Sequence, residues 1–295
     1  MSEDRVRPSG RSRGYLTRRT FLRAVAGAVG ALLAGGVGVM WYGLVFEPDW
    51  IEVTRVKVRV ASLPRAFVGL RLAHITDLHF GWFVGAAEAR AAVEAVLALR
   101  PDLVAITGDL VSRLTEVEAR IINDELSRLT APLGVYVILG NHDHWSNAEG
   151  VAELIAGAGL TLLRNASAVI EQDGQALYVA GVDDVWERKA DLSLALDGVP
   201  RDGRAILLAH EPDFADEAAK DRRVAVQLSG HSHGGQVRLP GRGAIRLPRL
   251  GRKYAYGLFT VGTMALYVNR GIGVAFPPIR LNCRPEVTLL ELAPA

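Results

Sequence analysis

Histidines and acidic residues recur in short clusters along this chain, and each cluster directly follows an apolar run. The most distinctive cluster is residues 230–236, Gly-His-Ser-His-Gly-Gly-Gln. Two histidines one residue apart can direct imidazole nitrogens at neighbouring points, and the flanking glycines let the backbone turn sharply and approach an ion or a phosphate. The segment predicts a metal-binding loop, with an ordinary polar loop as the alternative.

Other clusters add side chains with the same kinds of donor atom. Together the candidate ligands are Asp77, His79, Asp109, Asn141, His210, His231 and His233. These oxygen and nitrogen donors suffice for two divalent ions when one carboxylate bridges them. Two ions about 3.5–4 Å apart can hold one water as hydroxide and clamp the oxygens of a phosphoryl group. The set therefore predicts phosphoester hydrolysis without a protein nucleophile.

The ligand types leave several metals open. Cys283 is the only cysteine, so the chain can form neither a cysteine-based zinc site nor an internal disulfide. Histidine and carboxylate sites accept Mn²⁺, Fe²⁺ or Zn²⁺, and availability usually decides among them. We expect manganese first, with iron or zinc as the alternatives.

A repeated order of strand, ligand loop and helix positions the first clusters. Buried strands are predicted at 69–75, 103–107 and 135–139, with helices at 86–100 and 116–129 between them. Such repetition predicts an α/β sheet whose functional residues gather at the carboxyl ends of the strands.

The remainder of the chain is predicted to be richer in strands. A half-exposed strand at 51–60 precedes the repeat, a helix at 148–158 follows it, and a short helix follows Pro212. Further strands are expected at 168–171, 176–182, 205–209, 224–228, 264–269 and 286–292. The whole chain has 295 residues, of which 49% are hydrophobic, so it can bury a full core.

The N-terminus has the pattern of a targeting segment. Arg18 and Arg19 directly precede the apolar stretch 24–46, which would form about 34 Å of helix, enough to cross a bilayer. This arrangement resembles the twin-arginine export signal of bacteria, and a membrane helix inserted by the general route is the alternative. Because no good cleavage site ends the stretch, we expect a basic segment at 1–23, a retained signal-anchor at 24–46 and a catalytic domain at 47–295.

Charge indicates the orientation and the partners. Residues 1–23 carry seven arginines, which favour a cytoplasmic N-terminus and a catalytic domain on the outer face of a bacterial cytoplasmic membrane. The formal net charge is +2, but 27 basic and 30 acidic residues remain without this segment. An acidic body argues against nucleic acid as a partner. The expected partners are the membrane, the twin-arginine export machinery and a phosphorylated small-molecule or lipid substrate.

Residues 238–253 form a basic segment directly after the histidine loop. Its cationic residues are Arg238, Arg242, Arg246, Arg249, Arg252 and Lys253, and no acidic residue lies among them. The segment is either a solvated hairpin or a basic flap over a phosphorylated or anionic-lipid substrate.

The ordered motifs resemble a known superfamily. Asp77-x-His79, Gly108-Asp109, Gly140-Asn141-His142-Asp143, His210 and Gly230-His231-x-His233 are similar to the motifs of the calcineurin-like metallophosphoesterases, over residues 50–292. The resemblance implies a four-layer αββα sandwich of two mixed sheets, the metallo-dependent phosphatase fold, that follows the N-terminal membrane segment.

The same resemblance implies roles for single residues. It assigns Asp77, His79, Asp109 and His233 to one metal ion, and Asp109, Asn141, His210 and His231 to the other. Asp109 would bridge the two ions. His142 would stabilise the transition state or protonate the leaving oxygen without binding metal, and Asp143 would orient it.

Finer features narrow the expected activity. Purple acid phosphatases have a tyrosine three residues after the bridging aspartate, whereas this chain has Ser112. The export signal, Gly234-Gly235-Gln236 and the segment from Tyr267 to Glu286 resemble membrane-associated bacterial members. These members are often assigned as phosphodiesterases or as UDP-2,3-diacylglucosamine pyrophosphatases of lipid A biosynthesis, and the resemblance implies one of these activities. The alternatives are a nuclease or cyclic-nucleotide phosphodiesterase, and a non-catalytic metal-binding envelope protein.

Overall fold

The computed structural model describes residues 17–81 and 83–295. These residues fall into two units, Met1–Trp41 and Tyr42–Ala295, which are described separately. Residues 1–16 of the predicted basic segment lie outside the described residues. Helix α1 (Arg18–Val45) is, by length and composition, able to cross a membrane, and most of it belongs to the first unit. The helix begins before the predicted apolar stretch because the Thr17 hydroxyl caps it by accepting a hydrogen bond from the backbone N–H of Thr20.

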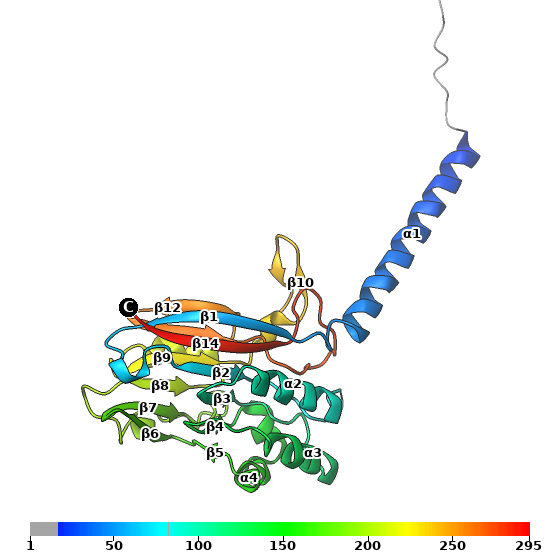
Figure 1. The fold of residues 1–295 in the computed structure, drawn as a ribbon. Coiled ribbons are helices and arrows are strands. Elements are labelled where there is room, and N and C mark those ends of the chain that lie inside the picture. The colour runs from blue at the N-terminus through cyan, green and yellow to red at the C-terminus, as the bar shows by residue number, and fades with distance from the viewer. Residues whose placement is uncertain (1–16, 82) are drawn as a thin grey trace, which may run out of the picture. The chain divides into compact units, whose positions relative to one another are not determined.

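Two six-stranded sheets dominate the second unit (Figure 1). In the first sheet, β2, β3, β4 and β5 run parallel, whereas β14 is antiparallel to β2 and parallel to β1. In spatial order its strands are β1 (Glu52–Val60), β14 (Glu286–Pro294), β2 (Arg71–Ile75), β3 (Leu103–Thr107), β4 (Val135–Ile138) and β5 (Thr161–Leu162). The register pairs Ile75 with Ile106 and Thr107 with Ile138, so the carboxyl ends of three strands lie at one edge.

The second sheet has four parallel central strands with an antiparallel strand at each edge. In spatial order its strands are β12 (Gly257–Val261), β13 (Met264–Val268), β9 (Val224–Ser229), β8 (Ala205–Leu208), β7 (Gln175–Gly181) and β6 (Ala166–Gln172). Both sheets are therefore mixed.

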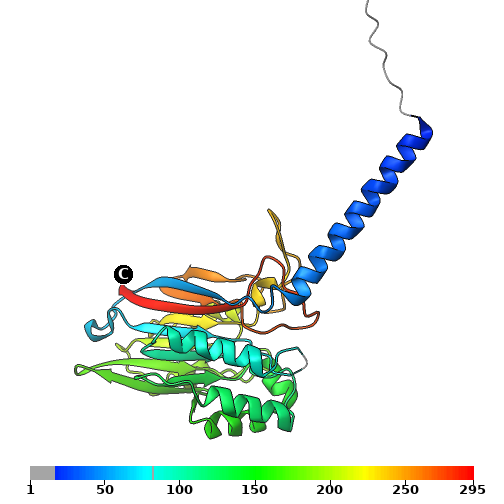
Figure 2. The ribbon, with the colours of Figure 1, turned by 45° about the vertical axis from the view of Figure 1, so that its right-hand side comes forward.

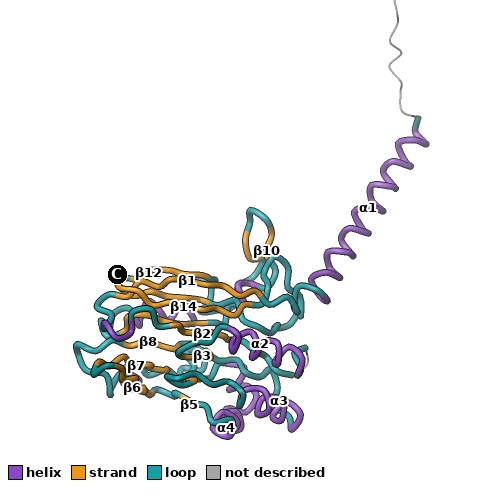
Figure 3. Tube along the Cα trace, viewed as in Figure 1, coloured by secondary structure: helices purple, strands orange, loops and turns teal. Residues whose placement is uncertain are grey.

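Three apolar clusters make this unit four layers thick (Figures 2 and 3). One lies between the first sheet and helices α2 (Ala86–Ala98), α3 (Glu116–Leu126) and α4 (Asn141–Gly157), and a second lies between the two sheets. The third lies under the short helices α5 (Leu192–Ala195) and α6 (Ala215–Ala218). Strand β8 contributes Leu208 to the middle cluster and Leu207 to the outer one, as the alternation of side chains along a strand requires. The predicted αββα architecture is confirmed.

The structure departs from the prediction for the helix after β4. That helix was expected at 148–158, but α4 begins at Asn141 and has a non-helical residue at Asn147. The early start follows from a cap, since the Asp143 carboxylate accepts a hydrogen bond from the backbone N–H of Gly140. The motif 140–143 thus forms the first turn of a helix, where backbone N–H groups favour anionic neighbours.

The basic segment contains a small hairpin. Strands β10 (Arg238–Leu239) and β11 (Gly243–Ala244) pair antiparallel and project from the second unit in Figure 1. Strand β12, which follows, had no counterpart among the predicted strands. Three short 3₁₀ helices complete the described elements, at Arg65–Phe67, Pro212–Phe214 and His233–Gly235.

Candidate metal centre

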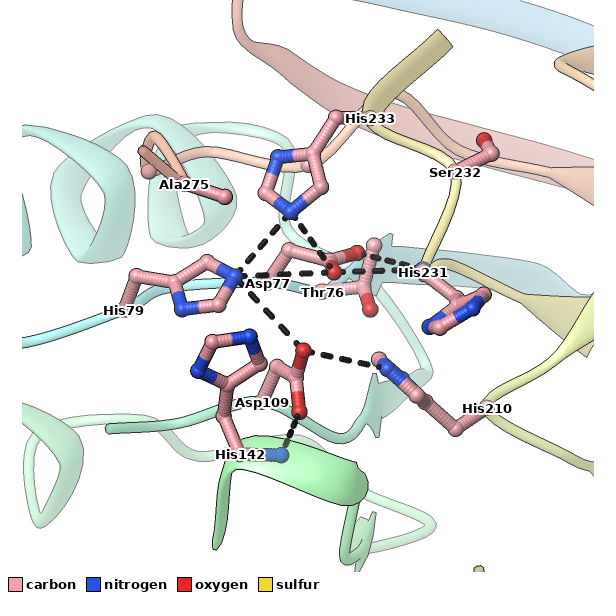
Figure 4. A network of polar contacts seen from close by, with 12 residues as sticks. Thr76, Asp77, His79, Asp109, His142, His210, His231, Ser232, His233 and Ala275 are labelled. Carbon is pink, nitrogen blue, oxygen red and sulfur yellow. Dashed lines mark hydrogen bonds and ion pairs between the residues drawn. The ribbon is translucent and has the colours of Figure 1, made fainter. Parts of the chain in front are cut away.

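Loops at the carboxyl ends of strands from both sheets bring all seven predicted ligands into one cluster. Asp77 and His79 follow β2, Asp109 follows β3, and Asn141 begins α4 directly after β4. From the second sheet, His210 follows β8, and His231 and His233 follow β9. Figure 4 shows most of these side chains pointing toward one another. Each is at most 6% exposed, so the cluster is almost fully shielded from bulk water.

The first half of the cluster joins two histidines and two carboxylates. Nε2 of His79 lies 3.0 Å from Nε2 of His233 and 3.6 Å from Oδ2 of Asp109. Nε2 of His233 lies 3.2 Å from Oδ1 of Asp77. Donor atoms of Asp77, His79 and His233 all lie within 4.8 Å of one another. This spacing suits ligands that share one ion, because metal–ligand bonds of about 2.1 Å place neighbouring donors about 3 Å apart.

The second half of the cluster shares Asp109. Oδ2 of this residue lies 3.2 Å from Nε2 of His210, and His231 completes a second group of donors within 4.8 Å. Nδ1 of His210 donates to the Thr107 carbonyl at 2.7 Å, so Nε2 is the ring nitrogen that faces Asp109 and would bind a metal. Nε2 of His231 donates to the Arg249 carbonyl, which leaves Nδ1 free. Such hydrogen bonds fix the tautomer that a metal requires.

Two further observations test whether this cluster fits metal ions. Among the described residues, the buried atoms without a hydrogen-bond partner include Oδ1 of Asn141, Nε2 of His210 and Nδ1 of His233. A buried polar atom without a partner is costly, so the first two atoms fit a role as ligands. The cluster also holds only oxygen and nitrogen donors, which suit divalent transition metals. The residues therefore fit two divalent ions with Asp109 between them.

The loops that hold the donors are strained. Five of the seven predicted ligands are non-glycine residues with positive φ, namely Asp77 (51°), His79 (50°), Asp109 (52°), His231 (67°) and His233 (49°). Such backbone costs on the order of 1–3 kcal/mol per residue and concentrates at functional sites. A Cβ at Gly230 would overlap Thr76 and Asp77, and one at Gly140 would overlap Asp109. The fold thus accepts local strain to bring these side chains together.

Burial sets the charge state of most of the histidines. It lowers the pKa of His79 and of His231 to about 3, and it lowers the pKa of His233 well below its usual range. Three neutral imidazoles at neutral pH are ready to bind metal without losing a proton. Burial also raises the pKa of Asp77 to about 7, because a carboxylate without a cation is unfavourable there.

His210 and Asp109 form a charged pair in the metal-free protein. Burial lowers the pKa of His210, but the Asp109 carboxylate more than offsets it, so this pKa lies well above its usual range. Burial raises the pKa of Asp109, but the neighbouring histidines more than offset this effect, so this pKa lies well below its usual range. A cation bound here would replace the proton of His210, so the pair again fits a metal site.

His142 lies beside the cluster, and Asp143 holds the start of helix α4, on which His142 lies. The His142 ring packs edge-on to the His79 ring at 4.7 Å between centroids, and its backbone N–H donates to Oδ1 of Asp109. The Asp143 carboxylate accepts from the backbone N–H groups of Val111 and Gly140, and no hydrogen bond joins it to the His142 ring among the described residues. Asp143 therefore positions His142 through the start of α4 and does not orient its ring directly.

A cavity of about 750 Å³ opens beside the donors, and it contains residues that the sequence analysis missed. Trp145 packs on His142, and Trp186 packs on both Trp145 and His231. The basic segment also lines this cavity, with Arg246, Arg249 and Arg252, and the Arg249 guanidinium lies 5.7 Å from the Trp186 ring centroid. Neither tryptophan has a distinctive sequence pattern, although Trp145 follows the 140–143 motif closely enough to be suspected.

Comparisons with known proteins agree with this geometry. Residues 70–235 match the family described as Calcineurin-like phosphoesterase. The uncharacterized metallophosphoesterase YkuE of Bacillus subtilis is 33% identical over 282 residues, which cover 94% of this chain and 98% of YkuE. Phosphodiesterase YaeI of Escherichia coli is 32% identical over 281 residues, covering 94% and 99%.

A vertebrate relative extends the comparison. The transmembrane protein with metallophosphoesterase domain of Danio rerio is 34% identical over 271 residues, which cover 86% of this chain and 60% of that protein. The two bacterial relatives match along nearly their whole length at more than 30% identity. This chain therefore belongs to the calcineurin-like phosphoesterase family and is a metal-dependent phosphoester hydrolase.

Proposed function

We propose that this protein is a membrane-anchored hydrolase of phosphodiester or pyrophosphate bonds that uses two divalent metal ions. The observation that carries this proposal is the gathering of seven buried donors, Asp109 among them, beside a cavity large enough for a substrate. When bound, the two ions would supply a hydroxide nucleophile and neutralise the phosphoryl oxygens. The remaining chemistry belongs to the side chains of this chain.

The proposed ligand sets follow the two halves of the cluster. Asp77, His79, Asp109 and His233 would hold one ion, and Asp109, Asn141, His210 and His231 the other. This division is supported by the distances around His79 and His233 on one side and around His210 on the other. Manganese is the metal we propose first, with iron or zinc as alternatives, because nitrogen and carboxylate donors accept all three.

We propose His142 as the group that protonates the leaving oxygen. His142 lines the cavity. Its backbone N–H donates a hydrogen bond of 2.8 Å to Oδ1 of Asp109, which holds the residue beside the proposed bridging carboxylate. A histidine held beside a scissile phosphoester can contribute about 10²–10⁴-fold to the rate by proton transfer. The Asp143 carboxylate connects the first turn of α4, which contains His142, to the loop after β3 by accepting a hydrogen bond from the backbone N–H of Val111.

The substrate we propose is a lipid-linked phosphodiester or pyrophosphate, and UDP-2,3-diacylglucosamine is the first compound to test. The cavity combines guanidinium groups for phosphate oxygens with tryptophan faces and aliphatic side chains for rings or lipid. Two relatives are named phosphodiesterase and transmembrane protein. These features favour a lipid-linked substrate over nucleic acid.

For location, we propose a signal-anchor in a bacterial cytoplasmic membrane, with the catalytic domain 47–295 on the outer face. Helix α1 supports the anchor by its length and composition, and the arginines of segment 1–23 support the orientation. Arg18 and Arg19 in front of the apolar stretch support export by the twin-arginine machinery. Lipid A precursors are processed on the cytoplasmic side, so cleavage of UDP-diacylglucosamine would require this orientation to be revised.

The experiment uses the full chain in detergent, stripped of metal and reloaded with Mn²⁺. It is incubated with UDP-diacylglucosamine, a soluble bis-aryl phosphodiester, cyclic AMP or DNA, and the products are identified by mass. Asp109→Asn removes the bridging carboxylate, and Asp173→Asn is the matched control, because Asp173 lies in an exposed hairpin turn at φ 50°, where asparagine fits equally well.

Four outcomes distinguish the candidate functions. Release of UMP and lipid phosphate by the wild type and by Asp173→Asn, but not by Asp109→Asn, establishes a pyrophosphatase. Turnover of the soluble diester alone would support a dinuclear hydrolase and would exclude UDP-diacylglucosamine as its substrate. Preference for cyclic AMP or DNA would favour the nuclease or cyclic-nucleotide phosphodiesterase. No turnover of any compound would favour the non-catalytic metal-binding protein.

A further inference from the structure

The mouth of the cavity carries an unusual combination of exposed side chains, which we call the docking rim. Its apolar members are Leu239, Ile245 and Phe276, which are 39%, 63% and 84% exposed. Its cationic members are the exposed residues Arg242, Arg246 and Arg249. Within residues 17–81 and 83–295, no ion pair joins these three guanidinium groups to a carboxylate. Free cations beside exposed aliphatic and aromatic groups are typical of a surface that binds an anionic and apolar partner.

The rim has two parts that are held together by a buried glutamine. One part is the β10–β11 hairpin, which projects from the second unit in Figure 1, together with the residues that follow it as far as Arg249. The other part is the loop that contains Phe276. Nε2 of Gln236 donates to the carbonyls of Ala275 and Pro277, and Oε1 accepts from the backbone N–H of Ala275. A bridge between Val237 and Leu281 extends the connection. The hairpin and Phe276 therefore form one surface.

The same loop fixes the point at which the apolar N-terminal segment joins the second unit. The backbone N–H of Arg280 donates to the Gly43 carbonyl at 2.9 Å, and a Cβ at Gly43 would lie only 2.8 Å from the Arg280 carbonyl oxygen. Cys283 N–H donates to the carboxylate of buried Glu47. Residues 42–47 and Phe276 are thus attached to a single segment, 275–283.

Residues 42–50 themselves have the composition of a membrane–water interface. Phe46 and Trp50 are 55% and 52% exposed, Tyr42 stacks on Phe46, and the Arg284 guanidinium lies 3.5 Å from the Trp50 ring centroid. Aromatic side chains concentrate at this level of a bilayer. With the proposed membrane anchor, the chain would leave the membrane at residues that are held by the same segment as the docking rim.

The docking rim also borders the catalytic cavity. Ile245, Arg246, Arg249 and Phe276 line it, together with His142 and the metal-ligand candidates Asp109, Asn141, His231 and His233. A lipid whose headgroup entered this cavity could leave its apolar part at the rim. Leu239 and Arg242 belong to the rim but do not line the cavity.

We propose that the docking rim binds the surface of an anionic phospholipid bilayer, with Ile245, Leu239 and Phe276 in the interfacial layer and the three arginines on lipid phosphates. This goes beyond the proposed function, because hydrolysis of a phosphoester does not require the mouth of the cavity to touch the membrane. Charge complementarity and the shared attachment of the rim and residues 42–47 favour a bilayer over a protein partner. The consequence is that the cavity opens onto the lipid surface.

The test places an environment-sensitive fluorophore at the rim of the full chain in lipid nanodiscs. Ile245→Cys and Phe276→Cys carry the label, and Val169→Cys is the control, because Val169 is 51% exposed on edge strand β6 in another part of the fold. The native Cys283 is fully buried, so the wild-type chain gives the background. We expect a blue shift and quenching by spin-labelled lipid at 245 and 276, and neither effect at 169.

A second arm tests the arginines. In nanodiscs that contain phosphatidylglycerol, Arg242→Gln should shift the docking equilibrium reported by the label at 276 about fivefold toward the undocked state, since each basic group near an anionic surface contributes about that factor. In pure phosphatidylcholine the two proteins should agree. Equal quenching at 245, 276 and 169 would overturn the proposal, as would a blue shift at the rim without quenching by spin-labelled lipid, which indicates burial against a second copy.

The result is independent of the proposed hydrolysis. Arg242→Gln and Leu239→Ser leave the cavity lining intact, so turnover of a soluble phosphodiester should be unchanged in both variants. If the wild type does not hydrolyse a soluble phosphodiester, the proposed function is contradicted, but the fluorescence result is unaffected. Absence of docking with normal soluble turnover contradicts the docking rim alone.

Discussion

Nε2 of His79 lies 3.0 Å from Nε2 of His233, although 154 positions separate the two residues in the sequence. The first follows a strand of one sheet and the second follows a strand of the other, so their contact depends on the packing of both sheets. Both imidazoles are buried and neutral, and Asp77 and Asp109 approach them from the sides. A cation between them would stabilise this arrangement of like donors.

Metal removal should therefore destabilise the fold measurably. A ligand at 100 times its Kd stabilises the native state by about 2.7 kcal/mol, and each of two sites adds its own contribution. We expect chelation to lower the thermal midpoint of the wild type and Mn²⁺ to restore it, as followed by circular dichroism. The Asp109→Asn protein should respond much less to Mn²⁺, while Asp173→Asn should match the wild type. A midpoint that is insensitive to chelator and metal would contradict the proposed site.

Replacing His142 should separate catalysis from metal binding. His142→Ala removes the proposed proton donor but no ligand, so kcat should fall about 10²–10⁴-fold. Metal content, measured by mass spectrometry of the dialysed protein, should stay at the wild-type level. The loss should be smallest for a substrate whose leaving group is acidic, because such a group needs little protonation. An equal loss for acidic and basic leaving groups would argue against proton delivery by this residue.

Gly140 and Gly85 form a matched pair that tests whether the close approach of a glycine to Asp109 matters. Gly140 and Gly85 both cap a helix with extended backbone, φ −114° and −117°, and both donate to a carboxylate three residues on. A Cβ at Gly140 would overlap Asp109, whereas the nearest atom at Gly85 is a flexible Glu88 oxygen 3.5 Å away. We expect Gly140→Ala to weaken metal binding, as measured by calorimetry, and Gly85→Ala to leave it unchanged. Equal affinity in both variants would show that the close approach to Asp109 is unimportant.

The carboxylate of Glu286 predicts a pH dependence of stability that arises from a group outside the predicted metal ligands. Burial raises its pKa, but Arg270 and the Tyr267 hydroxyl more than offset this, so the pKa is lowered from 4.5. A carboxylate with a lowered pKa contributes stability that is complete above the unfolded value and is lost as pH falls through the folded value. The free energy of unfolding should therefore decline below about pH 4.5 partly through this group.

Glu286→Gln tests that contribution. Breaking a buried pair by removing one charge costs about 3–5 kcal/mol, and here the exposed Glu52 partner of Arg270 should reduce the loss. Denaturant unfolding at pH 7 should show the variant to be less stable, and the gap should narrow as the solution is acidified. Glu291→Gln, on the same strand in an exposed pair with Lys57, is the control and should change stability little. A gap that is constant with pH would contradict the assignment.

The strand–loop repeat explains why much of the fold and the positions of the donors could be predicted. Buried apolar runs that end in Asp77, Asp109 and Asn141 follow directly from the rule that functional residues lie at the carboxyl ends of parallel strands. The start of α4 was missed because the 140–143 motif reads as a loop, whereas the Asp143 carboxylate caps it into a helix. The same cap explains why Asp143 does not reach the His142 ring.

Long-range packing limited the prediction of the cavity. Trp145 packs against Trp186, and its indole N–H donates to the carboxylate of Glu187, 42 residues away. No local sequence pattern predicts a contact between residues so far apart. Residues 238–253 were expected to be either a hairpin or a flap, and they contain a small hairpin while also lining the cavity. Asn269 holds the turn at Gly271 through its side-chain oxygen.

We propose that Asp109 joins two metal ions into one catalytic centre. The most direct measurement is electron paramagnetic resonance of the Mn²⁺-loaded full chain, with metal counted and turnover of a soluble phosphodiester assayed on the same sample. We predict two spin-coupled ions in the wild type and in Asp173→Asn, and loss of both coupling and turnover in Asp109→Asn. An Asp109→Asn protein that keeps coupled ions and wild-type turnover would show that the Asp109 carboxylate is not needed to join the ions.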